Sequence, residues 1–231
     1  MTQKILFAVI TCGKFKDRAD AQRETWVIEA KKFSYVDVKF FLGTQDREPL
    51  PDEVFLDVDD SYLGLPQKVQ CAIQWAREND YTKMVKLDDD VFVFPDRLLA
   101  SIPRADYVGQ INGEPPFCSG FCYWLSWKAM KYISAAELPD DPQVGEDRFV
   151  STVLRDHGIR PTGDPQIYTA SCLPRTADVN SNTKACAEFT PEELKKLAEG
   201  PKGWAERSRI AAEKARRHAM ITRGDGTRLF G

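Results

Sequence analysis

The chain of 231 residues carries 32 basic and 35 acidic side chains and 42% hydrophobic residues, a balance typical of a soluble globular protein. This length can bury the core of one large α/β domain. Six cysteines are too few for a disulfide scaffold of this size, and the two histidines do not cluster with cysteines, which disfavours a zinc site.

Charge is distributed unevenly along the chain. Residues 1–189 hold 22 of the basic and 29 of the acidic side chains, so the remaining segment is net positive. Its Lys and Arg alternate with Glu on a helical pattern, typical of a solvated face, and we expect no nucleic-acid partner. No apolar run approaches the ~18 residues that span a membrane, and no signal-peptide pattern precedes the first strand. We therefore expect a cytoplasmic protein without an integral membrane segment.

Strands and helices are predicted to alternate along the first two thirds of the chain. Apolar runs predict strands at residues 4–11, 35–42, 53–58, 83–87 and 106–111. Helices are predicted at 18–32, after Pro66, after Pro95, after the aromatic segment 121–127 and after Glu146, then in the tail near 191–199 and 203–219. The alternation favours a mixed, mostly parallel central sheet flanked by helices. We expect one domain at 1–189 and a helical extension packed on it at 190–231.

Three consecutive aspartates, Asp88, Asp89 and Asp90, follow the predicted strand at 83–87. Adjacent like charges at an apolar strand end disfavour each other's ionised forms, so they usually share a divalent metal or are neutralised through solvent. Oxygen ligands favour Mg²⁺ or Mn²⁺ over zinc. The triplet alone leaves a solvated acidic turn as the alternative.

Ligands of a parallel sheet bind at the carboxyl ends of its strands, where Thr11, Asp88 and Asp90 are expected. Arg23 lies on the stripe of its predicted helix that packs on the sheet, so it needs an anionic partner, either a phosphate or a carboxylate in a structural salt bridge. Lys68, near the start of the helix after Pro66, could meet an anion there, and an exposed lysine is the alternative. Arg18 is a further candidate for anion binding.

A second acidic segment, Glu146-Asp147, begins a predicted amphipathic helix. Aspartate at a helix start is typical of an N-cap, so a capping role is the structural alternative for Asp147.

Five segments occur together in the order and approximate spacing of one protein family. They are residues 18–26, 65–68, 86–93, 119–126 and 146–147. The chain resembles, over roughly residues 4–160, the β-1,3-galactosyltransferase and Fringe-like glycosyltransferases, inverting GT-A enzymes of glycosyltransferase family thirty-one. The resemblance implies a Rossmann-like nucleotide-diphospho-sugar transferase fold with its catalytic domain at 1–189. Animal members usually carry a membrane anchor, which this sequence does not show, and residues after 160 match nothing in the family pattern.

The resemblance also implies a reaction and a partner set. A hexose or N-acetylhexosamine, with galactose favoured, would pass from a UDP-sugar donor to a hydroxyl of a glycan or glycoconjugate acceptor, with inversion and a β-1,3 linkage. Asp147 would be the general base, with Glu146 as the alternative.

The same resemblance implies the metal ligands. Mn²⁺, or Mg²⁺, would be held by Asp90 and Asp88, and His218 from the tail is the candidate third ligand, an exposed histidine being its alternative. Donor binding is expected from Thr11, Arg18, Arg23, Lys68, Asp88, Asp89 and Gly120.

Two other functions compete with this interpretation. A haloacid-dehalogenase-type phosphatase also has Asp-x-Asp at a strand end, but there the motif follows the first strand, whereas here it follows a late one. A catalytically inactive sugar- or nucleotide-binding module of the GT-A fold would share the architecture, and the intact Asp88, Asp90 and Asp147 disfavour it.

Overall fold

The computed structural model describes residues 3–169, 179 and 182–200. The predicted tail helix at 203–219, with His218, lies outside the described residues, and so does Cys172.

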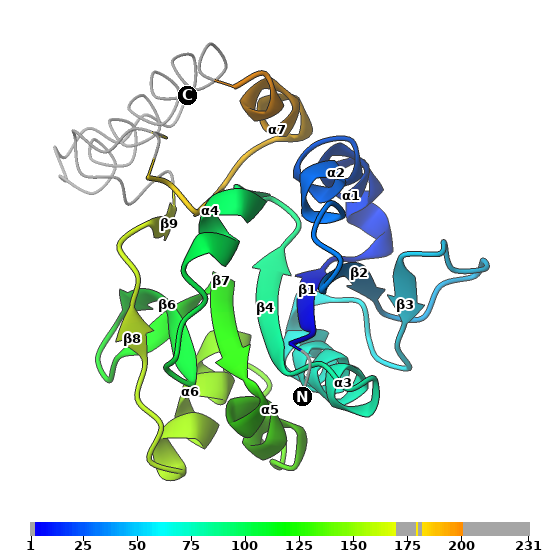
Figure 1. Ribbon diagram of the computed structural model, residues 1–231. Helices are drawn as coiled ribbons and strands as arrows, with labels where there is room; N and C mark the ends of the chain where they lie inside the picture. Colours follow the sequence, from blue (N-terminus) through cyan, green and yellow to red (C-terminus); the bar gives the residue numbers. More distant parts are fainter. Residues whose placement is uncertain (1–2, 170–178, 180–181, 201–231) are drawn as a thin grey trace, which may run out of the picture.

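A mixed, mostly parallel sheet of seven strands forms the centre of the described part of the chain (Figure 1). Its order is β3-β2-β1-β4-β7-β6-β8. The strands are β1 Ile5–Ile10, β2 Val36–Leu42, β3 Glu53–Phe55, β4 Lys83–Asp88, β6 Tyr107–Asn112, β7 Phe117–Ser126 and β8 Thr162–Gly163. Only β7 runs antiparallel to its neighbours in this sheet. The predicted α/β class and sheet type are confirmed.

Helices cover both faces of the sheet. On one face the core includes side chains from α2 Trp26–Ala30, α4 Pro95–Ala100 and α7 Pro191–Ala198, together with α1 Lys16–Arg23. On the other face it includes side chains from α3 Leu65–Glu78, α5 Trp127–Ser134 and α6 Glu146–Asp156. Alternate residues of β1 enter the two cores, as the two-residue period of a strand requires.

The predicted stripe of α3 is buried as expected. Its members are Val69, Ala72, Ile73 and Ala76, all fully inaccessible to solvent. The helix follows the short 3-10 turn η2, Tyr62–Gly64, and carries Pro66 in its first turn.

The single helix predicted at 18–32 is wrong, because the chain breaks it into α1 and α2. Thr25 leaves the helical region, with φ −122° and ψ −111°, and its hydroxyl donates to the Ala21 carbonyl at 2.6 Å. Trp26 then restarts the helix with its indole in the core, donating to the Val91 carbonyl at 3.2 Å. A helical stripe in the sequence does not reveal such a hydroxyl-capped break.

A second, small sheet was not predicted. It joins β5 Phe92–Val93, β10 Ala185–Ala187 and β9 Ile167–Thr169, with β10 in the middle. The segment 171–188 carries no period that would indicate a strand, and β10 forms through long-range pairing with β5. This pairing brings the chain after β10 next to the acidic triplet, where the Phe189 amide donates to the Asp90 carbonyl at 3.2 Å.

Candidate active site

The acidic triplet lies at the carboxyl edge of the sheet, where β4 ends beside β1. Asp88 pairs in register with Ile10, the last residue of β1. The turn after Asp88 is braced from α1 by the buried side-chain amide of Gln22, which donates to the carbonyls of Asp88 at 3.0 Å and Val91 at 2.9 Å. Helix α1 therefore fixes the direction in which the three carboxylates leave the strand.

The three carboxylates point to different partners. Asp88 meets the ammonium of Lys86. Asp89 is buried and accepts from the Thr11 hydroxyl at 2.8 Å and from Arg18 Nη1 at 3.0 Å. Within the described residues the Asp90 carboxylate accepts no hydrogen bond, although it faces the same edge of the sheet.

Burial and the neighbouring charges of Asp88 and Asp89 raise the pKa of Asp90 to about 7. Burial also raises the pKa of Asp89, and repulsion by Asp88 adds to this against the hydrogen bonds from Thr11 and Arg18. A bound cation would favour the ionised form of Asp90, as any opposite charge a few ångströms away does.

A cleft of 260 Å³ opens over the triplet between the ends of β1 and β4 and the start of α3. Thr11, Arg18, Lys68 and all three aspartates line it, with the exposed ring of Tyr62 among the other lining residues. An adjoining hollow of 560 Å³ shares Phe15, Arg18 and Asp90 with this cleft and is lined on one side by residues 188–191 after β10. The two together make a groove that runs across Asp90.

Lys68 is 1% exposed, so the exposed-lysine alternative is wrong. Its ammonium donates to the Thr11 carbonyl at 3.1 Å and pairs with Asp60. Asp60 also accepts from the amides of Gly13 at 2.9 Å and Gly43 at 2.7 Å. Burial alone would raise the pKa of Asp60, but the hydrogen bonds from Lys68 and the two glycines outweigh it and lower the pKa.

Arg18 remains available at the groove. Its side chain is one-third exposed, stacks 4.3 Å from the centre of the Phe15 ring and holds Asp89 through one nitrogen. Because Arg18 lines both parts of the groove beside Asp90, the N–H groups that Asp89 does not use can meet an anion there.

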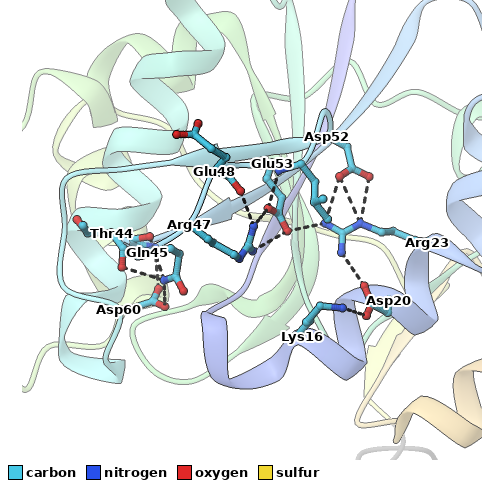
Figure 2. A network of polar contacts seen from close by, with 12 residues as sticks. Lys16, Asp20, Arg23, Thr44, Gln45, Arg47, Glu48, Asp52, Glu53 and Asp60 are labelled. Atoms are coloured by element: carbon cyan, nitrogen blue, oxygen red, sulfur yellow. Dashed lines mark hydrogen bonds and ion pairs between the residues drawn. The ribbon is translucent and has the colours of Figure 1, made fainter.

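Arg23 is not part of this cluster. Figure 2 shows it facing Asp20, Asp52 and Glu53, with nitrogen–oxygen distances of 2.9, 3.1 and 2.9 Å, and it lies over the Phe40 ring at 4.2 Å. Arg23 therefore forms the structural salt bridge that was the alternative to phosphate binding. The position of Arg23 on the sheet-facing side of its helix correctly indicated an anionic partner. It could not distinguish a carboxylate of the protein from the phosphate of a bound ligand.

Asp147 lies in the first turn of α6, near β7. Gly145 is the N-cap of the helix, so the capping alternative for Asp147 is wrong. The half-buried carboxylate accepts one hydrogen bond, from the Arg148 amide at 2.8 Å. The neighbouring Glu146 is buried and has both oxygens engaged, Oε1 by the Tyr123 hydroxyl and Oε2 by Lys86 at 3.4 Å.

Gly120 lies where β7 passes the start of α6. Its carbonyl accepts from Lys86, and a Cβ atom at this position would lie 2.8 Å from Glu146 Oε2 and 3.7 Å from the Asp147 Cβ. Glycine is therefore required for this close approach, and no donor-binding geometry is needed to explain it.

Among the described residues no cluster of three or more His, Cys, Asp or Glu side chains could hold a metal ion by itself. The triplet offers Asp90, whose carboxylate has no hydrogen-bond partner in the described part of the chain, with Asp88 beside it. Mg²⁺ and similar hard cations are commonly held by one or two carboxylates together with substrate phosphates, so this donor set fits a cation bound jointly with a nucleotide. The predicted third ligand, His218, lies outside the described residues.

Several residues of the site had no role assigned from the sequence. Gln22 lies within the motif at residues 18–26. Lys86 is a charged residue within a buried strand, and this position indicates that its ammonium needs a buried anionic partner. Asp60 stands in the polar loop before α3, without a distinguishing mark. The wall at 188–191 depends on the pairing of β10 with β5, which the sequence does not indicate.

The galactosyltransferase family model matches residues 17–114, which include Arg18, Lys68 and the acidic triplet. This match confirms the resemblance expected from the motifs. No curated protein matches the sequence. No helix among the described residues has the length and apolar character to span a membrane.

Solved structures include similar folds. One is a glycosyltransferase involved in the glycosylation of the major capsid of PBCV-1, with a TM-score of 0.56 and 17% identity over 85% of this chain and 99% of that chain. Another is a putative nucleotide-diphospho-sugar transferase from Desulfovibrio desulfuricans G20, with a TM-score of 0.46 and 11% identity over 71% of this chain and 80% of that chain. The first likeness confirms the GT-A type of fold.

Proposed function

We propose that this chain moves a hexose or N-acetylhexosamine from a UDP-sugar to a hydroxyl of a glycan acceptor. The family match and the GT-A fold support a glycosyltransferase function. The proposed transfer is metal-dependent and inverting, with galactose the favoured sugar and a β-1,3 linkage the favoured product. The observation that carries the proposal is the Asp90 carboxylate, which is open to a groove that Arg18 also lines. Lys86 links Asp88 at this strand end to Glu146, the neighbour of Asp147 in the first turn of α6.

On the donor side, Asp90 and Asp88 would hold Mn²⁺ or Mg²⁺. When bound, the cation supplies positive charge that neutralises the diphosphate leaving group. Arg18 would donate to a phosphate oxygen through the N–H groups that Asp89 does not use. Lys68 and Asp60 act differently, because their charges are paired and they fix the Thr11 backbone at the floor of the cleft.

On the acceptor side, Asp147 would accept the proton of the attacking hydroxyl. Among the described residues its half-buried carboxylate accepts a hydrogen bond only from the Arg148 amide, which leaves lone pairs for this proton. Glu146 is less suited, because both its oxygens are already hydrogen-bonded, one by Tyr123 and the other by Lys86. A single displacement of UDP by this hydroxyl inverts the anomeric centre.

The test is a screen of UDP-sugars with Mn²⁺ against a panel of glycans, comparing the wild type with Asp147→Asn. Loss of the base at unchanged shape should lower kcat by about 10²-fold or more while UDP affinity stays near normal. Asp156→Asn, exposed at the far end of the same helix, is the matched control and should keep wild-type kcat.

Three results would contradict the proposal. Near-normal turnover in Asp147→Asn would exclude this base, and a product with retained configuration would exclude a single displacement. UDP-sugar binding by the wild type without transfer to any acceptor would favour the inactive binding module.

A further inference from the structure

A buried polar cluster connects the two halves of the site. Its members are Lys86 on β4, Tyr123 on β7 and Glu146 at the start of α6, and we call it the Lys86 cluster. Lys86 is 2% exposed and lies opposite Tyr123 in the register of the two strands. The Tyr123 hydroxyl donates to Glu146, whose second oxygen lies 3.4 Å from Lys86.

The Lys86 ammonium also reaches the donor side of the site. It contacts the Asp88 carboxylate, two residues before Asp90, and the Gly120 carbonyl. One charged group therefore touches the strand end that carries the metal-binding aspartates and the helix turn that carries Asp147.

Stability alone does not explain a buried cluster of charged side chains at this position. Burying charged groups costs several kcal/mol per ion, and apolar side chains of similar volume often stabilise a core equally well or better. What a satisfied ionic cluster adds is a defined geometry, because each partner must stay within hydrogen-bonding distance. The absence of a side chain at Gly120 leaves the space for this contact, since a Cβ there would approach Glu146 Oε2 to 2.8 Å.

We propose that Lys86, Glu146 and Tyr123 are positioning residues that lock the first turn of α6 to the carboxyl end of β4 and so set the distance between the donor carboxylates and Asp147. The inference rests on the proposed function, in which Asp147 must meet the acceptor hydroxyl opposite the departing diphosphate. Misplacement of a reacting group by about 1 Å can cost about 10²-fold in rate, so a rigid link across this gap is useful to the reaction.

The decisive variant is the neutral double substitution Lys86→Met with Glu146→Gln. Removal of only one charge leaves its partner buried and unpaired, which destabilises the fold. A loss of activity could then not be separated from a loss of folded protein. The double variant removes the two buried charges and leaves Asp88, whose side chain is 39% exposed, to be solvated by water. The introduced amide oxygen would still accept from Tyr123, so the melting temperature should stay within a few degrees of wild type. It should nevertheless lower kcat by about 10-fold or more, with KM for the UDP-sugar changed less than about 3-fold.

Tyr123→Phe is the milder companion variant, with Tyr107→Phe as its matched control. Both tyrosines are fully buried and adjacent, and Tyr107 donates its hydroxyl to the Cys118 carbonyl, outside the cluster. Loss of the Tyr123 hydroxyl should lower kcat, and loss of the Tyr107 hydroxyl should affect only stability. Equal kcat losses in the two variants would overturn a specific role of Tyr123.

Hydrogen exchange of the peptide covering residues 145–150 supplies a readout that needs no turnover. Faster exchange in the folded double variant, with lowered kcat, supports the proposal. Wild-type kcat or unchanged exchange in that variant overturns it, and so does a rate loss that only follows the unfolded fraction. Should the wild type transfer no sugar at all, the proposed function fails, and the exchange measurement still decides whether the cluster holds the helix turn.

Discussion

At the scale of single residues, the acidic triplet separates into three environments. Asp88 faces Lys86, Asp89 faces Thr11 and Arg18, and only Asp90 keeps a carboxylate without a protein partner in the described residues. Adjacency in the sequence therefore does not give the three carboxylates the same environment, because successive residues at a strand end point in different directions.

The two candidate arginines of this region should respond oppositely to substitution. Arg18→Met removes a groove-lining donor and should weaken UDP binding with Mn²⁺ by about 10-fold, since hydrogen bonds to charged groups contribute about 1.5–3 kcal/mol. Arg23→Met leaves the buried Glu53 and the half-buried Asp52 without this cation, and should lower the melting temperature without changing UDP affinity. Calorimetric titration and thermal melting of both variants measure the two effects. A weaker UDP affinity in Arg23→Met would restore Arg23 to the nucleotide site.

At the scale of elements, the strands β1, β2 and β4 and the helix α3 follow from apolar runs, the Pro66 start and the buried stripe, so they could be predicted. The break at Thr25 could not, because a single hydroxyl bond to the Ala21 carbonyl decides it. Burial of Lys68 depends on Asp60, which lies eight residues earlier in the loop before α3 and which no sequence pattern marks as its partner. Local patterns thus locate the aspartates at the sheet edge, but the partners of Asp89, Thr11 and Arg18, come from elements far away in the sequence.

Helix α7 offers a test of how the wall beside Asp90 is held. Its first turn has a capping box, in which the Thr190 and Glu193 side chains each bind the other's backbone amide, at 3.3 and 2.8 Å. Thr190→Ala should cost about 1 kcal/mol of unfolding free energy, or about 2–4 °C in melting temperature for a chain of this size. Thr152→Ala, exposed within α6, is the control and should change stability by less than about 0.5 kcal/mol. Equal stability of Thr190→Ala and wild type in urea would show that the cap does not hold this wall.

At the scale of the whole molecule, the site lies at the carboxyl end of β1 and β4, and both helical layers contribute to it. The layer with α1 contributes Arg18 and braces the triplet through Gln22, and the opposite layer contributes Lys68 from α3 and Asp147 from α6. Folding therefore assembles the site from both layers, and it leaves Asp90 ionisable in a partly buried position.

The charge of Asp90 links cation binding to pH. Its pKa is raised from 3.8 to about 7, so the folded, cation-free state holds a proton that the unfolded chain releases. This contribution to stability is present below the ordinary pKa and is lost as pH rises through 7. Carboxylates with lowered pKa, such as Asp60, behave oppositely and lose their stabilising contribution only in acid.

Because Mn²⁺ must compete with this proton, the rise in melting temperature caused by Mn²⁺ with UDP should be larger at pH 8 than at pH 6. Asp90→Asn has no proton to lose and no charge for the cation, so it should show little Mn²⁺-dependent stabilisation at either pH. Any pH dependence left in that variant belongs to UDP itself or to other groups of the protein, which makes the variant the control for the wild type. Thermal melting with Mn²⁺ and UDP, against the same samples in excess chelator, measures the difference. Equal stabilisation of wild type at both pH values, or full stabilisation of Asp90→Asn, would mean that the cation does not bind Asp90.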